Sequence, residues 1–161
     1  MTQSPIRCLI LACGNTLRED DGVGPWLAAW AEERFRDNPA IRSIALQQWT
    51  PELSEDIAAA GSVLFIDCAI DAAPGSVRLT SVEPGDAPAA LATHHLGPAQ
   101  LLSLSQELYG SIPRASLLLT IGAASINLRE GFSDIVSAAL PEARTLLEQA
   151  VARLLTPTPK P

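Results

Sequence analysis

Residues 7–26 read "RCLILACGNTLREDDGVGPW" and predict a strand, an acidic glycine-rich loop and the start of a helix. The near-continuous apolar run 7–13 is typical of a strand that is buried on both faces of a sheet. Pro25 stands in what would be the first turn of the helix, where the missing N–H of proline is tolerated. A buried strand that leads through a loop into a helix indicates an α/β protein.

The same alternation continues along the chain. Further strands are expected at residues 41–49, 62–70 and 114–124, with a return strand at residues 74–80 beyond a turn at Pro74-Gly75. Helices are expected at residues 25–37, 50–61, 98–110 and 133–155, with a loop at residues 82–91. Thr50 and Ser133 are the expected N-caps, and Pro141 is expected to kink or divide the last helix.

This order predicts an α/β fold, a three-layer α/β/α sandwich with a twisted, mostly parallel five-stranded sheet. Residues 1–155 are expected to form a single α/β domain, because a chain of 161 residues can bury one core and no linker divides it. Residues 156–161, "TPTPKP", are expected to form a flexible proline-rich tail. Ligands of such sheets bind beyond the carboxyl ends of the strands, which is where the loop 14–24 falls.

Composition and charge argue against several classes of protein. The net charge is −7 and the eleven basic residues are scattered singly, so neither nucleic acid nor an anionic membrane is an expected partner. No apolar run approaches the ~20 residues of a membrane span and the N-terminus lacks a convincing export signal, so a cytoplasmic location is expected.

The three cysteines form no CxxC pair and are expected to be reduced and mostly buried. Trp26, Trp30 and Trp49 are expected to belong to the core.

Five polar side chains are candidates for a metal site. Asp20 and Asp21 lie in the loop after the first strand, Asp67 lies at or near the end of the third strand, and His94 and His95 precede a helix. If the sheet is parallel, the first and third strands end at one edge that the histidine loop can also reach. Two aspartates and one histidine suit borderline divalent ions such as Ni, Zn or Mn, and three ligands leave positions open for a substrate.

These residues also have purely structural explanations. An aspartate in a loop often closes a turn or caps a helix, and His94 could hydrogen-bond the first turn of the helix that follows it. Asp67 is harder to explain in this way, because an unpartnered carboxylate at the end of an apolar strand is costly. The spacing alone assigns no separate role to Asp20 or His95.

Other chemistries fit the sequence less well. The loop matches neither GxGxxG nor GxxxxGK[ST], and its carboxylates would repel a phosphate, so Gly22 and Gly24 are expected to provide positive φ and close backbone approach. Cys68 follows Asp67 on one strand and is expected to point to the opposite face, as a small buried hydrophobe and not a nucleophile. The GxSxG motif of serine hydrolases is absent from the sequence.

These motifs together resemble those of hydrogenase maturation proteases, the endopeptidases that trim the C-terminus of the nickel-iron hydrogenase large subunit. The loop "GNTLREDDGVG" is similar to the family signature GN-x-L-x-x-D-[DE]-x-x-G. Three further matches follow in the family's order, "LFIDCAIDAAPGSV", "THHLGP" and "FSDIVSAALPEA". The resemblance extends from about Cys8 to Leu155.

The resemblance implies an endopeptidase domain that removes the C-terminal extension of a nickel-iron hydrogenase large-subunit precursor after nickel insertion. It places the residues that recognise the metal on Asp21, Asp67 and His94, and it implies that the enzyme has no nucleophile of its own. It also implies that the precursor is the partner, that the precursor supplies the nickel, and that no metal is bound permanently.

Two other functions remain open from the sequence. A non-catalytic chaperone that carries nickel would use the same three ligands. A signalling receiver domain also has an acidic pair after its first strand and an aspartate at the end of its third. Here, however, the pair lies several residues beyond the strand, and the one lysine of the chain is Lys160, in the tail.

Overall fold

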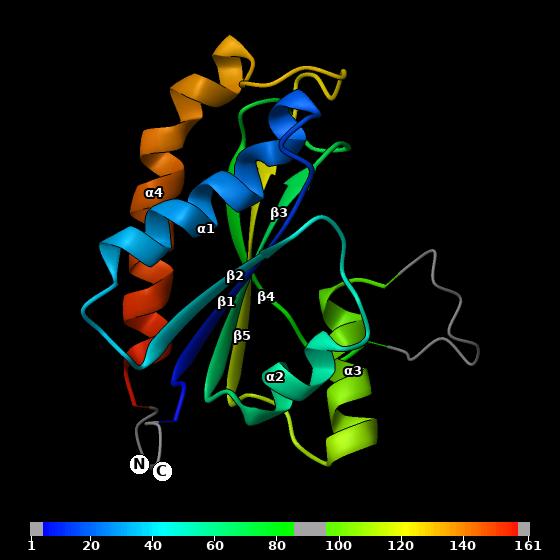
Figure 1. Cartoon of the computed structure of the whole chain (residues 1–161), viewed down its shortest axis with the longest axis vertical. Helices are drawn as coiled ribbons and strands as arrows, with labels where there is room; N and C mark the ends of the chain where they lie inside the picture. The colour runs from blue at the N-terminus through cyan, green and yellow to red at the C-terminus, as the bar shows by residue number, and fades with distance from the viewer. Residues whose placement is uncertain (1–4, 86–95, 158–161) are drawn as a thin grey trace.

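Residues 5–85 and 96–157 are described by the computed structural model, which places a sheet between two layers of helices (Figure 1). The strands, in the spatial order β2-β1-β3-β5-β4, are β1 (Cys8–Cys13), β2 (Ile41–Leu46), β3 (Ser62–Ala69), β4 (Val77–Ser81) and β5 (Ala115–Gly122). All neighbouring pairs are parallel except β4 and β5, which are antiparallel. The predicted α/β/α sandwich with a mostly parallel five-stranded sheet is confirmed.

The helices form the two outer layers. One face of the sheet is covered by α1 (Val23–Arg34) and α4 (Asp134–Leu155), and the other by α2 (Leu53–Ala59) and α3 (Pro98–Tyr109) (Figure 1). A short 3-10 helix, η1 (Glu19–Gly22), leads into α1. Within the described residues, none of the helices combines the length and the apolar character that crossing a membrane requires.

Both faces of β1 are buried, as its apolar run predicts. Ile10 belongs to the core between the sheet and α1 and α4, whereas Leu9 and Leu11 belong to the core beneath α2 and α3. Each large side chain buried in this way stabilises the fold by about 1.5–3 kcal/mol. The strand is thereby fixed in the middle of the molecule, and the loop that follows it begins from a rigid base.

The expected ends of α3 and α4 are confirmed. Gly110, at a φ of 66°, ends α3 in the left-handed conformation. The Ser133 hydroxyl accepts a hydrogen bond from the Val136 N–H at 3.3 Å and caps α4.

Pro141 does not divide α4, which is continuous from Asp134 to Leu155. A proline inside a helix costs about 3 kcal/mol, because one hydrogen bond is lost and its ring is crowded. Leu147, Val151 and Leu154 are buried on the same helix, and the burial of each contributes about 1.5–3 kcal/mol. Packing against the sheet therefore outweighs the cost of the proline.

Two predictions for the segment between β2 and β3 are wrong. The strand ends at Leu46 and does not extend to Trp49, because the Trp49 ring packs instead against Phe65 on the face covered by α2 and α3. Thr50 is not the N-cap of α2. Its carbonyl accepts a hydrogen bond from the Leu53 N–H at 3.2 Å within a turn, and the helix begins only at Leu53.

The order of the strands defines a topological switch point. From β1 the chain passes through α1 to β2 at one edge of the sheet, whereas from β3 it continues to β4 and β5 on the other side. Open α/β sheets bind ligands where the carboxyl ends of two such strands diverge. Asp21 in η1 follows β1 and Asp67 belongs to β3, so both predicted carboxylates lie at this position.

Candidate functional site

The loop between β1 and α1 is held in place by close backbone contacts. The Asn15 N–H donates a hydrogen bond to Asp21 Oδ2 at 2.8 Å. A Cβ atom on Gly14 would lie 2.0 Å from the Asp21 carbonyl oxygen, and one on Gly24 would lie 2.5 Å from the Cys13 carbonyl oxygen. Neither position has room for a side chain, so these glycines allow Asp21 to lie against the end of β1.

The prediction of positive φ at Gly22 and Gly24 is wrong. The residues of this loop with positive φ are Gly14, at 154°, and Glu19, at 45°. The expected close approach is confirmed at both glycines, since a Cβ atom on Gly22 would lie 2.9 Å from Thr16 Cα. These glycines are therefore required for space and not for an unusual backbone conformation.

Asp67 is partly buried near the end of β3. Its Oδ1 accepts a hydrogen bond from the Cys68 N–H at 2.8 Å, and the Trp49 side chain lies near enough to lower the pKa of the carboxylate as a donor. Burial raises the pKa of Asp67 to about 6, opposed by these two donors and reinforced by the charge of Asp21. Because Asp21 follows β1 and Asp67 lies near the end of the adjacent strand β3, the fold places both residues at the same edge of the sheet.

Asp20, next to Asp21 in the sequence, is fully buried and is used differently. Its Oδ2 accepts hydrogen bonds from the Ala124 N–H (2.8 Å), the Ser125 N–H (3.0 Å) and the Ser133 hydroxyl (2.8 Å), and its Oδ1 accepts one from the Ser133 N–H (2.8 Å). Burial acts to raise the pKa of Asp20, but these bonds lower it below the ordinary value of 3.8. Asp20 therefore joins η1 to the loop after β5 and to the N-cap of α4.

The two histidines lie outside the described residues, as do residues 86–91 of the predicted loop and residues 158–161 of the predicted tail. Among residues 5–85 and 96–157, no group of three or more histidine, cysteine, aspartate or glutamate side chains is arranged to hold a metal ion. The described part of the site supplies the carboxylates of Asp21 and Asp67, and a ligand from His94 stays a prediction.

Several solved structures share this arrangement of strands and helices, although no family model and no curated protein matches the chain. The hydrogenase maturating endopeptidase HybD from E. coli is 22% identical, with a TM-score of 0.70 over 91% of this chain and 93% of that chain. The NiFe hydrogenase maturation protease HycI from Thermococcus kodakarensis is 23% identical, with a TM-score of 0.64 over 94% of each chain. A hydrogenase 2 maturation peptidase from a Thaumarchaeota archaeon is 23% identical, with a TM-score of 0.65 over 93% of this chain and 99% of that chain. This chain has the fold of hydrogenase maturation endopeptidases.

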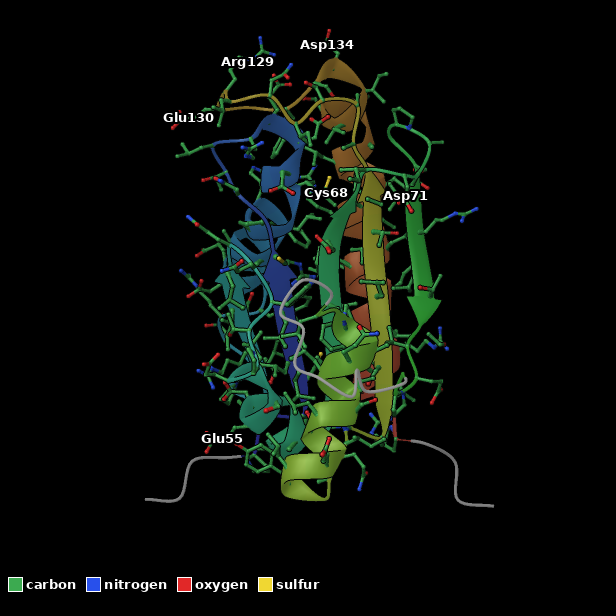
Figure 2. The ribbon with its side chains drawn as sticks, turned by 90° about the vertical axis from the view of Figure 1, so that its right-hand side faces the viewer. Glu55, Cys68, Asp71, Arg129, Glu130 and Asp134 are labelled. Carbon is green, nitrogen blue, oxygen red and sulfur yellow. The ribbon has the colours of Figure 1, made fainter. Side chains whose placement is uncertain are left out.

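In this version of the maturation-endopeptidase fold, η1 is also braced by the loop after β5. The Glu19 N–H donates to the Arg129 carbonyl at 2.8 Å, and the Arg129 N–H donates to the Leu17 carbonyl at 3.0 Å. Arg129 Nε lies 3.4 Å from Oε1 of the buried Glu19 carboxylate. Figure 2 shows Arg129 and Cys68 toward the same end of the molecule, with Glu55 of α2 at the opposite end.

Two thiols lie near the carboxylates but are not activated. Burial, reinforced by the charges of Asp21 and Asp67, raises the pKa of Cys13 and of Cys68 to about 12. Cys68 packs against the core beneath α1 and α4, as the alternation of side chains along β3 predicts. This direction favours the protonated thiol, so neither cysteine is activated as a nucleophile by its surroundings.

The receiver-domain alternative does not agree with the geometry of the acidic pair. Such a site would use Asp20 and Asp21 together. Asp20 has no exposed surface, and both of its oxygens accept hydrogen bonds from the protein. The pair therefore consists of one structural carboxylate and one that is available at the sheet edge.

Trp49 contacts the site and is not singled out by the sequence, which indicates only a core aromatic. The available signal is the polar pair Gln47 and Gln48 directly before it, which marks the end of the apolar part of β2. Trp49 is packed against the core as expected, and its side chain also lies near enough to Asp67 to lower the pKa of that carboxylate as a donor.

The pKa values of Asp67 and Asp20 are expected to be shifted in opposite directions from the ordinary value of 3.8. In a ¹³C NMR titration of the carboxyl groups, Asp67 should have its midpoint near pH 6 and Asp20 should remain ionised below the ordinary value of 3.8. The raised pKa of Asp67 contributes stability below pH 3.8 that is lost as the pH rises through 6. The lowered pKa of Asp20 contributes stability above pH 3.8 that is lost on further acidification. Asp67→Asn should remove the transition near pH 6, and its persistence in that variant would contradict the assignment.

Proposed function

We propose that this chain is an endopeptidase that removes the C-terminal extension of a nickel-iron hydrogenase large-subunit precursor after nickel insertion. The nickel belongs to the substrate, and Asp21, Asp67 and His94 are the residues that recognise it. The observation that carries the proposal is the placement of Asp21, just after β1, and Asp67, near the end of the adjacent strand β3, at the switch point of a fold shared with proteins named hydrogenase maturation endopeptidases.

The chemistry of the two carboxylates supports recognition of a cation. Burial, reinforced by the charge of Asp21, makes the ionised form of Asp67 unfavourable in the free protein. A divalent ion near both carboxylates would favour the ionised form of Asp67, and a precursor that already carries nickel would bring such an ion to the site. The ion could then polarise the scissile carbonyl or position a water molecule, since the described thiols near the site are not activated as nucleophiles.

The test is to incubate the purified chain with nickel-loaded and nickel-free precursor and to measure both products by mass spectrometry. Only the nickel-loaded precursor should lose the mass of a short C-terminal peptide. Transfer of nickel to this chain with no change in the mass of the precursor would instead identify a metal carrier. An uncut precursor with no transfer of nickel would refute both functions.

A further inference from the structure

Trp49 reaches the site because β2 ends early. The strand stops at Leu46, and the chain then turns over the face of the sheet that α2 and α3 cover. The Trp49 and Phe65 rings meet edge to face, with centroids 5.6 Å apart and planes at 83°. The Cys13 thiol at the end of β1 donates to the Gln47 carbonyl at 3.5 Å, so the backbone that leads into Trp49 is also held against the sheet.

The position of Phe65 brings the indole close to Asp67. Residues two apart on a strand point to the same face and lie about 6–7 Å from each other. An indole packed on Phe65 therefore lies on the Asp67 side of the sheet, near enough to the carboxylate to lower its pKa as a hydrogen-bond donor. Two donors from different parts of the chain therefore face the carboxylate, the Cys68 N–H, which bonds Oδ1 at 2.8 Å, and the Trp49 indole.

The two donors have different effects on the carboxylate. The Cys68 N–H comes from the next residue of the strand and moves with Asp67. The indole comes from the segment after β2 and is braced on Phe65, so it fixes the carboxylate relative to the rest of the sheet. Without the indole, the carboxylate would be held by the Cys68 N–H alone, which does not fix it relative to the neighbouring strands.

We infer that Trp49 is a positioning residue, whose indole N–H holds the Asp67 carboxylate in the direction required to meet the metal ion carried by the substrate. This inference rests on the proposed function. Groups that hydrogen-bond a metal ligand from behind typically change affinity or activity by about 10–100-fold when they are removed.

Trp49→Phe separates the positioning role from the packing role. Phenylalanine keeps an aromatic ring against Phe65 but lacks the pyrrole part of the indole and its N–H donor. Trp26 provides the matched control. Its ring also meets a phenylalanine, Phe132, edge to face, at 6.1 Å and 88°, but it packs against the core on the opposite face of the sheet. Thermal unfolding of Trp49→Phe and Trp26→Phe should confirm that both variants are folded.

The first measurement is independent of enzymatic activity. In a ¹⁵N-labelled sample, the chain's three tryptophans give three indole N–H signals, and the one missing from Trp49→Phe belongs to Trp49. Asp67→Asn should shift that signal while those of Trp26 and Trp30 stay in place. An unshifted Trp49 signal would overturn the inference.

The second measurement is the cutting of nickel-loaded precursor. Trp49→Phe should lower kcat by about tenfold with KM within about twofold, whereas Trp26→Phe should cut at the wild-type rate. If Asp67→Asn is inactive but Trp49→Phe cuts normally, the positioning role is wrong and the proposed function stands. If Asp67→Asn itself cuts normally, the role of Asp67 in the proposed function fails, and the role of Trp49 fails with it.

Discussion

Asp67→Asn is expected to lower the rate of cutting of nickel-loaded precursor by at least about 100-fold, because the neutral amide cannot replace a charged metal ligand. The same substitution should stabilise the fold. A shift of the Asp67 pKa from 3.8 to about 6 means that ionisation opposes folding, so removing the charge should raise the free energy of unfolding at pH 7 by about 1–3 kcal/mol. A residue whose loss increases stability and abolishes activity is retained for function.

Asp21→Asn and His94→Gln complete this experiment. Both variants should also leave the precursor uncut, with thermal unfolding close to that of the wild type. Mass spectrometry of the precursor measures the first result, and a thermal scan by circular dichroism measures the second. Normal processing by all three variants would rule out the metal-recognising triad, whatever the stability of the variants.

Asp20→Ala is expected to produce the opposite outcome, a loss of stability by about 3–5 kcal/mol. The substitution leaves the hydrogen-bond donors of Ala124, Ser125 and Ser133 without their buried acceptor. It also detaches η1 from the N-cap of α4. Urea unfolding followed by circular dichroism measures the change.

Asp21→Ala is the matched control, because Asp21 adjoins Asp20 and accepts a single described hydrogen bond, from the Asn15 N–H. Its free energy of unfolding should fall by no more than about 1 kcal/mol. Equal urea midpoints for the alanine variants of Asp20 and Asp21 would show that the buried carboxylate does not hold the loops together.

The fold class was predictable because the apolar runs and the helix-end residues of the sequence agree with the burial and the helix ends of the structure. The apolar runs of β1, β3 and β5 are buried as their composition indicates, and Ser133 and Gly110 mark helix ends where the sequence places them. The end of β2 was not predictable, because it depends on the packing of Trp49 against a ring in another strand.

The candidate site was predictable only in part. Asp67 stands out as a carboxylate at the end of an apolar strand, a feature of local sequence. The distinction between Asp20 and Asp21 is not local, because Asp20 bonds with Ser133, 113 residues away, and only the complete fold brings them together. The convergence of His94 with Asp21 and Asp67 stays a prediction, since His94 lies outside the described residues.

The bonds of Asp20 have a consequence for how a large partner would dock. They anchor the acidic loop to the longest helix before any partner arrives, so little conformational entropy is left in the loop to be lost on association. A rigid acidic loop favours a partner whose surface already fits the shape of the loop. It disfavours a partner that could bind only if the loop changed its conformation. Under the proposed function, discrimination between a finished and an unfinished metal centre would follow from shape as well as from charge.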